Sequence, residues 1–279
     1  MYSEWFVRYA EDIYRCIADD TISESGNLRT LDWPETNRNA TLNEVEMKIS
    51  HTFMVRDHCK EIAQWLRLSE HDIKLATIIG LFHDLGRFNQ ALWYGTMNDR
   101  ITGSHGDMSV EVFLKDAPHT GMSDYDKHFV TEALRYHNHF KIPDNLSPRA
   151  KLFTKLVRDA DKMDIFRFYT NKEETSKFRF IIVDGEGERS PELVERLLQG
   201  KNLHINELKN PNDRVLMQIS LVYDLNFGYS CQWLLEKGYL AKLTGVFDGT
   251  ADPAMKKVHE YAENWLRERV NVGINCSKQ

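Results

Sequence analysis

Residues 69–86, SEHDIKLATIIGLFHDLG, join an apolar helical run to a histidine–aspartate pair. Ser69 fits a helix N-cap, and Gly86 fits a C-terminal stop. Ala76 and Ile79 lead by steps of three and four residues to His83. Because side chains three or four apart share a helix face, the spacing predicts that His83 and Asp84 point into a helix-packed interior.

The rest of the chain repeats this helical period and shows no extended alternating run. We therefore predict an all-α fold, a single helical domain over 1–279 with a core at 44–170 and a C-terminal helical extension at 190–272. Residues 21–43 are expected to form a long loop, and a small β-hairpin near 178–188 is left open. The predicted helices lie within 44–68, 69–86, 104–117, 123–140, 147–169, 191–199, 213–225, 229–238 and 254–270.

Composition narrows the class of protein. Lys and Arg number 36 against 42 Asp and Glu, for a formal net charge of -6. This balance argues against duplex nucleic acid and membrane surfaces as partners. The four cysteines form no C-x-x-C pair, which argues against a disulfide scaffold or thiolate zinc module. No signal peptide and no run of about 20 apolar residues is present, so we expect a cytoplasmic protein.

Ionisable residues fall on the predicted inner faces of several helices. His51, His137 and Asp161 continue apolar stripes just as His83 and Asp84 do. A buried carboxylate without a partner costs several kcal/mol, so a shared cation is the best explanation, although inward histidines also occur as ordinary core residues. Imidazole and carboxylate suit Zn, Fe, Mn, Ni or Co, with Mg also open. Asp159 and Asp164 project from other faces of their helix and are expected to be solvated.

Five motifs occur in a telling order: HTFMV, GLFHDLGRF, GSHG, RYHNH and RDADKMD. This order resembles the HD-domain superfamily of metal-dependent phosphohydrolases, over about residues 48–168. The HD-GYP subgroup is not matched, because Asn138 follows His137 and no Gly-Tyr-Pro signature appears. The resemblance implies a first metal held by His51, His83, Asp84 and Asp161. It implies a second metal held by His105 and His137, with Asp84 bridging.

The expected activity is metal-assisted hydrolysis of a small phosphorylated metabolite or nucleotide, with one or two divalent transition metals as cofactor. Asp84 and Arg87 are the predicted catalytic residues, and Arg87 is also expected to contact a phosphate by its fork of donors. His139 and Lys162 are further candidates for substrate binding, with a surface position or an ion pair as their alternatives. A di-iron oxygenase and a regulatory ligand-binding module remain as other functions, and a homodimer remains open.

Overall fold

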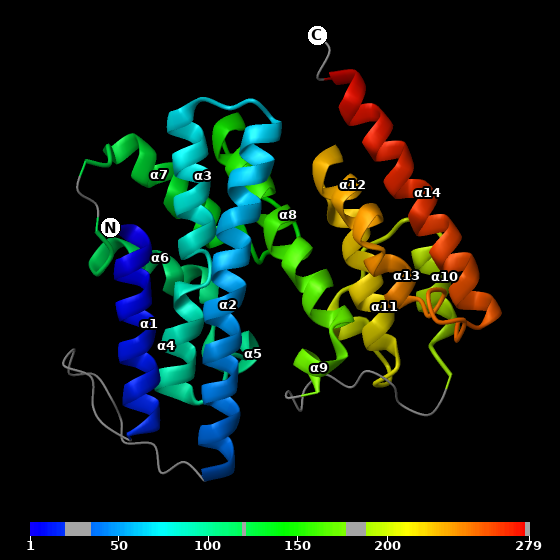
Figure 1. The fold of residues 1–279 in the computed structure, drawn as a ribbon, viewed down its shortest axis with the longest axis horizontal. Coiled ribbons are helices and arrows are strands. Elements are labelled where there is room, and N and C mark those ends of the chain that lie inside the picture. The colour runs from blue at the N-terminus through cyan, green and yellow to red at the C-terminus, as the bar shows by residue number, and fades with distance from the viewer. Residues whose placement is uncertain (20–34, 119–120, 177–187, 277–279) are drawn as a thin grey trace. The chain divides into compact units, whose positions relative to one another are not determined.

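The structure is a computed structural model that describes residues 1–19, 35–118, 121–176 and 188–276 (Figure 1). Every regular element within these ranges is a helix, which confirms the all-α prediction. The β-hairpin considered near 178–188 falls almost entirely outside the described residues. None of the described helices is long and apolar enough to cross a bilayer.

The chain forms two compact units, Met1–Arg158 and Asp159–Gln279. The sequence predicts a single helical domain over 1–279, and that stays a prediction. The helices of the first unit are α1 (Tyr2–Ala18), α2 (Glu35–Trp65), α3 (Glu70–Phe82), α4 (Leu85–Tyr94), α5 (Asp99–Thr102), α6 (His105–Lys115) and α7 (Asp124–Tyr136). Helix α8 (Pro148–Thr170) begins in the first unit and ends in the second. The second unit continues with α9 (Lys172–Thr175), α10 (Pro191–Leu197), α11 (Asp213–Ser220), α12 (Gly228–Lys237), α13 (Tyr239–Leu243) and α14 (Pro253–Cys276), and with two short 3₁₀ turns, η1 (Ile205–Glu207) and η2 (Leu221–Asp224).

Serine caps set three helix starts in the first unit, as the sequence predicts. The hydroxyls of Ser69, Ser104 and Ser123 accept hydrogen bonds from the backbone N–H groups at the third following residue. Each cap satisfies a donor that the helix itself leaves unpaired. Helix α2 then packs along α3, α4 packs against α6, and α6 packs against α7 (Figure 1). The apolar faces that meet there are fully buried, Phe82 and Phe88 among them.

The single helix predicted over 69–86 is wrong, because two helices meet there. Helix α3 ends at Phe82, α4 begins at Leu85, and His83 and Asp84 lie at the junction. Gly86 is not a stop but the second residue of α4. A Cβ at Gly86 would collide with the carbonyl oxygen of His105 and lie 2.7 Å from the Cβ of Met108. Glycine is therefore required by the close approach of α4 and α6 rather than by a helix end.

The loop predicted over 21–43 is also wrong in its C-terminal part, where α2 starts at Glu35. Thr41 and Val45 are buried at 2% and 0% exposure, and the Thr41 hydroxyl donates to the carbonyl oxygen of Gly95. Tertiary burial thus offsets the weak helix propensity of Asn39 and Asn43. Helix α1, which the sequence reading left unassigned, packs on α2 as an amphipathic helix.

The second unit has its own apolar core, contributed by α10, α11, α12 and α14. Two expectations fail within α8. Asp159 and Asp164, expected to be solvated, are both at 0% exposure. Asp159 accepts hydrogen bonds from the backbone N–H groups of Asn226 and Phe227, at 2.9 and 3.0 Å, and Asp164 pairs with Arg167 at 2.5 Å. The backbone N–H groups in the turn after η2 need an acceptor. Asp159 is therefore buried, although helical periodicity predicts that it faces solvent.

Candidate metal centre

Asp84 lies at the junction of α3 and α4 with only 3% of its surface exposed. Its two carboxylate oxygens are surrounded by histidines from α2, from α6 and from the ends of α3 and α7. His51, His83, His105 and His137 are themselves 0–3% exposed. The inward orientation predicted for these residues is therefore observed in the first unit.

The four rings divide into two pairs, one on each oxygen of Asp84. The Nε2 atoms of His51 and His83 lie 3.6 and 3.3 Å from Oδ2. Those of His105 and His137 lie 3.3 and 3.7 Å from Oδ1. Candidate ligand atoms of His83, Asp84 and His137 all lie within 4.8 Å of one another. A carboxylate faced in this way has the donor arrangement of a bridge between two cations.

Hydrogen bonds on the far side of three of the four rings fix which nitrogen faces Asp84. The Nδ1 atoms of His83 and His137 donate to the carbonyl oxygens of Gly80 and Leu134, at 2.8 and 2.7 Å. The Nδ1 atom of His105 donates to the carboxylate of Asp99 at 2.7 Å. Because carbonyl and carboxylate oxygens only accept, each of these three rings carries a proton on Nδ1, and a ring with a single proton has its lone pair on Nε2. This orientation by a second partner is typical of histidines that ligate metals.

Neighbouring Nε2 atoms lie close together, and between His105 and His137 the two lone pairs face each other. The distance is 3.3 Å between His51 and His83 and 3.0 Å between His105 and His137. Burial and the charge of Arg87 lower the pKa of His105 to about 3, so that this ring is neutral near pH 7. Lone pairs that face one another around a carboxylate need a proton or a cation between them. The donor set thus fits divalent metal ions of the kind that imidazole and carboxylate prefer.

Lys48 supplies a positive charge that the sequence analysis did not identify. Its ammonium lies 2.5 Å from Oδ2 of Asp84, and the Lys48 side chain is 16% exposed. Burial opposes ionisation of Asp84, but Lys48, followed by His83, holds the pKa of its carboxyl well below the ordinary value. Lys48 precedes His51 by three residues, so it lies on the same face of α2. That spacing was the signal available in the sequence.

A second layer of side chains positions His105. Asp99 receives hydrogen bonds from Arg87 at 2.8 Å, from Gln90 at 2.9 Å and from Asn138 at 3.4 Å. Arg87 also donates to the carbonyl oxygen of Met97 and to Gln90. Burial raises the pKa of Asp99, but the hydrogen bond from His105 and the charge of Arg87 more than offset this, and the net shift is strongly downward. Arg87 therefore acts in the structure as an anchor for Asp99, and its contact with a phosphate stays a prediction.

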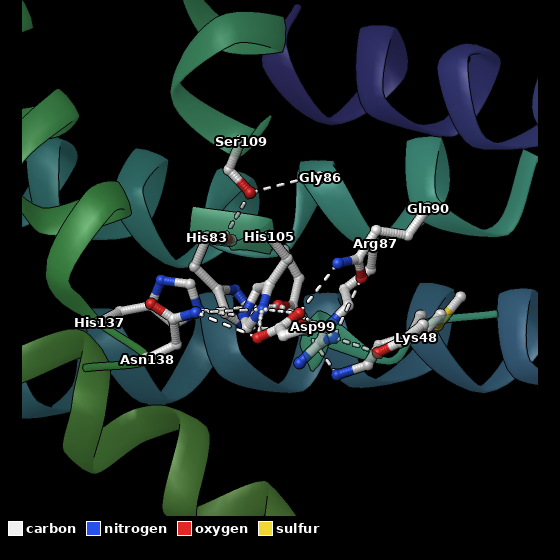
Figure 2. A network of polar contacts seen from close by, with 12 residues as sticks. Lys48, His83, Gly86, Arg87, Gln90, Asp99, His105, Ser109, His137 and Asn138 are labelled. Atoms are coloured by element: carbon white, nitrogen blue, oxygen red, sulfur yellow. Dashed lines mark hydrogen bonds and ion pairs between the residues drawn. The ribbon is translucent and has the colours of Figure 1, made fainter. Parts of the chain in front are cut away.

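Two further residues hold the backbone of the site. The Ser109 hydroxyl accepts from the N–H of Gly86 and donates to the carbonyl oxygen of His83, both at 2.8 Å, as Figure 2 shows. Arg158 donates to the carbonyl oxygens of His137 and His139. The first interaction fixes the α3–α4 junction, and the second fixes the turn after α7. Neither residue shows a sequence signal, because each acts through the backbone of a distant segment.

Three further residues that the sequence predicts for the site are Asp161, Lys162 and His139. Asp161 lies on α8 in the second unit and is partly exposed, and its role as a ligand stays a prediction. Lys162 pairs with Asp224 at 2.7 Å, the ion-pair alternative that the sequence left open. The His139 ring packs edge-on against Tyr136, and among the described residues no hydrogen bond or ion pair joins it to Asp84. Burial lowers the pKa of His139.

Comparison of the sequence with models of protein families identifies the family of this chain. The model of the SidE phosphodiesterase (PDE) domain matches residues 35–231, which is more than half of the chain. The chain belongs to this phosphodiesterase family, which supports a hydrolase that acts on ester bonds. The match covers Asp84, the four histidines, Lys48 and Asp99. No curated protein and no solved structure matches the chain.

Proposed function

We propose that this member of the SidE phosphodiesterase family is a metal-dependent phosphodiesterase of the HD type, with Asp84 at the centre of its active site. The observation that carries the proposal is the division of four histidine Nε2 atoms between the two oxygens of one buried carboxylate. Burial of such a donor set costs free energy, and the binding of cations offsets this cost. The proposed substrate is a small phosphorylated metabolite or a nucleotide.

The two histidine pairs define the proposed ligands. His51, His83 and Oδ2 of Asp84 would hold one divalent ion, with Asp161 as the fourth ligand that the sequence resemblance implies. His105, His137 and Oδ1 of Asp84 would hold the other. Divalent ions at such a site polarise phosphoryl oxygens and lower the pKa of water towards neutrality.

The chain's own residues have distinct parts in this proposal. Asp84 would supply one carboxylate oxygen to each of the two ions, beside one histidine pair. Lys48 balances the charge of Asp84 and places an ammonium beside the site, where a phosphoryl oxygen can accept a hydrogen bond from it. Asp99 keeps the proton of His105 on Nδ1, which leaves Nε2 free to ligate. Arg87 holds Asp99 through Nη1, and in the proposal its guanidinium also contacts the substrate phosphate.

The test combines metal content with hydrolysis. Protein purified without added metal is analysed for bound ions and then assayed on bis(p-nitrophenyl) phosphate and on p-nitrophenyl phosphate, with Mn, Co, Ni, Mg and Fe supplied in turn. We expect two ions per chain at saturation and turnover of the diester, with loss of one ion in His137→Ala. His128→Ala, which removes an exposed histidine of α7, is the matched control and is expected to behave as wild type.

Three outcomes would contradict the proposal. Diester hydrolysis that survives complete removal of metal would exclude metal dependence. Oxygen consumption with an iron-loaded protein and no ester hydrolysis would favour the oxygenase alternative. Full metal occupancy with no turnover of either ester would favour a regulatory module.

A further inference from the structure

The second unit contains a cavity of its own, far along the chain from the histidines. Its volume is about 680 Å³, and all its lining residues lie between Arg167 and Met255. They come from the end of α8, from α9 and α11, and from α13 and the turn that connects it to α14. Sites for small molecules typically measure about 300–1,000 Å³. The size therefore suits a ligand of the mass of a nucleotide.

Two arginines form rigid parts of the wall, because carboxylates already hold them. Arg167 pairs with Asp164 at 2.5 Å and with Glu174 at 2.6 Å. Arg189 pairs with Asp252 at 2.9 Å. The charges of both guanidinium groups are thus balanced within the unit. They fix the shape of the cavity and leave the recognition of an anion to other cations.

Lys172 and Lys242 are those other cations. Both line the cavity, whose wall also contains Asp248. Local hydrogen bonds and the charge of Lys172 lower the pKa of Asp248, so Lys172 is partly balanced by this carboxylate, whereas among the described residues no ion pair within 4.0 Å involves Lys242. The Lys242 ammonium lies over the rings of Tyr239 and Phe247, at 5.3 and 5.7 Å from their centroids. Lys242 is therefore the stronger of the two candidates to bind an anionic ligand.

The turn between α13 and α14 holds an exposed aromatic ring in place. Phe247 is 71% exposed, yet its N–H donates to the carbonyl oxygen of Ala241 at 3.0 Å. Gly245 has a positive φ of 75°, and a Cβ there would lie 2.6 Å from the Thr250 hydroxyl. The N–H of Ala251 donates back to the carbonyl oxygen of Gly245 at 3.0 Å. The turn is thus built by hydrogen bonds and a required glycine, and it presents a large apolar ring to solvent at the cavity.

We propose that this cavity, the α13–α14 pocket, is a second ligand site that binds a nucleoside monophosphate. Lys242 and Lys172 bind the phosphate, and the exposed ring of Phe247 stacks on the base. The Lys242 ammonium lies 5.7 Å from the centroid of the Phe247 ring, and the 71% exposure of this residue leaves aromatic surface on which a base can stack. The inference does not depend on the chemistry proposed for Asp84, because the pocket shares no residue with that centre.

The test is calorimetric titration of the full chain with AMP, GMP, CMP and UMP. We expect binding of at least one of them, weakened at least about tenfold by Lys242→Gln and by Phe247→Ala. Adenosine and ribose 5-phosphate, which each lack one half of AMP, are expected to bind more weakly than the whole nucleotide. Lys237→Gln, at an exposed lysine of α12 outside the pocket, is the matched control and should retain wild-type affinity.

A repeat of the titration in Asp84→Asn separates the pocket from the histidine centre. We expect the binding that depends on Lys242 to persist in this variant. Wild-type affinity in both Lys242→Gln and Phe247→Ala would overturn the inference, and so would the absence of binding by all four nucleotides. Nucleotide binding that is lost in Asp84→Asn but kept in Lys242→Gln would assign the ligand to the histidine centre alone. None of these results decides whether the diester is hydrolysed, so the two proposals fail separately.

Discussion

Each unit contains an almost fully buried aspartate, and the two differ in what surrounds the carboxylate. In the second unit Asp213, at 0% exposure, accepts hydrogen bonds from the N–H and hydroxyl of Ser190, both at 2.8 Å, and from the N–H groups of Lys209 and Asn210. In the first unit Asp84 is faced by one ammonium and by four imidazole rings.

This contrast separates a structural carboxylate from a candidate ligand. The donors around Asp213 are mostly backbone groups with fixed protons, so folding alone satisfies its oxygens. Three of the four rings around Asp84 present lone pairs that are fixed by hydrogen bonds on their far sides. Burial by itself therefore does not identify a site. The kind of group that faces the buried charge does.

The largest effect is expected for Asp84→Asn on catalysis. An amide keeps the size of the side chain but loses the charge that both histidine pairs share. We expect loss of most of the rate enhancement, which in enzymes is at least about 10⁶-fold, measured as kcat/KM on the diester. Asp213→Asn serves as the comparison, and the folded fraction of this variant should have the kcat of the wild type. Equal catalytic losses in the two variants would erase the distinction between the carboxylates.

Lys48→Met tests the charge balance around Asp84 without reference to catalysis. Removal of one partner of a buried ion pair typically costs about 3–5 kcal/mol. We expect a loss of this size in the free energy of unfolding of metal-free protein, measured in urea, and partial recovery when Mn is added. Lys127→Met breaks an exposed pair with Asp124 on α7 and should cost less than about 1 kcal/mol. A Lys48→Met protein as stable as wild type without metal would contradict the role assigned to Lys48.

Asp213→Asn tests the structural carboxylate in the same way. Asparagine cannot accept all four hydrogen bonds, so buried N–H donors lose their partner. We expect a loss of about 3 kcal/mol in the free energy of unfolding, with no recovery on addition of Mn. Glu263→Gln, which removes the contacts of this carboxylate with Arg267 and His259 on α14, is the control and should cost less than about 1 kcal/mol. Recovery of Asp213→Asn by metal would show that this carboxylate also binds a cation.

The smallest effect is the pH dependence that Asp213 adds to stability. Burial raises the pKa of Asp213, but hydrogen bonds from Ser190, Lys209 and Asn210 lower it below the ordinary value. A lowered folded pKa gives stability that is present above the unfolded pKa of about 3.9 and is lost as the pH falls below it. The difference in unfolding free energy between wild type and Asp213→Asn should therefore be constant from pH 6 to 7 and shrink below about pH 4. A constant difference down to pH 3 would show that Asp213 titrates as an ordinary carboxyl.

Helical periodicity alone determined the fold class and the orientation of most of the centre. Steps of three and four residues correctly assigned His51, His83, Asp84 and His137 to inner faces. The serine caps gave the starts of three helices. His105 was found only through the family resemblance. It lies in the loop-like GSHG, at the first residue of α6, and so it continues no apolar stripe of that helix. These residues were predictable because periodicity and capping are properties of neighbouring positions in the sequence.

Several features of the structure depend on tertiary contacts that helical periodicity does not predict. The break between α3 and α4 and the requirement for Gly86 come from the packing of α6 against the junction. Asp99 enters the site from a segment with no helical stripe, and its place is set by Arg87, Gln90 and Asn138. Asp159 is buried because a distant turn needs an acceptor for its N–H groups. In each case the partner lies far away in sequence, and local periodicity carries no information about which distant groups the fold brings together.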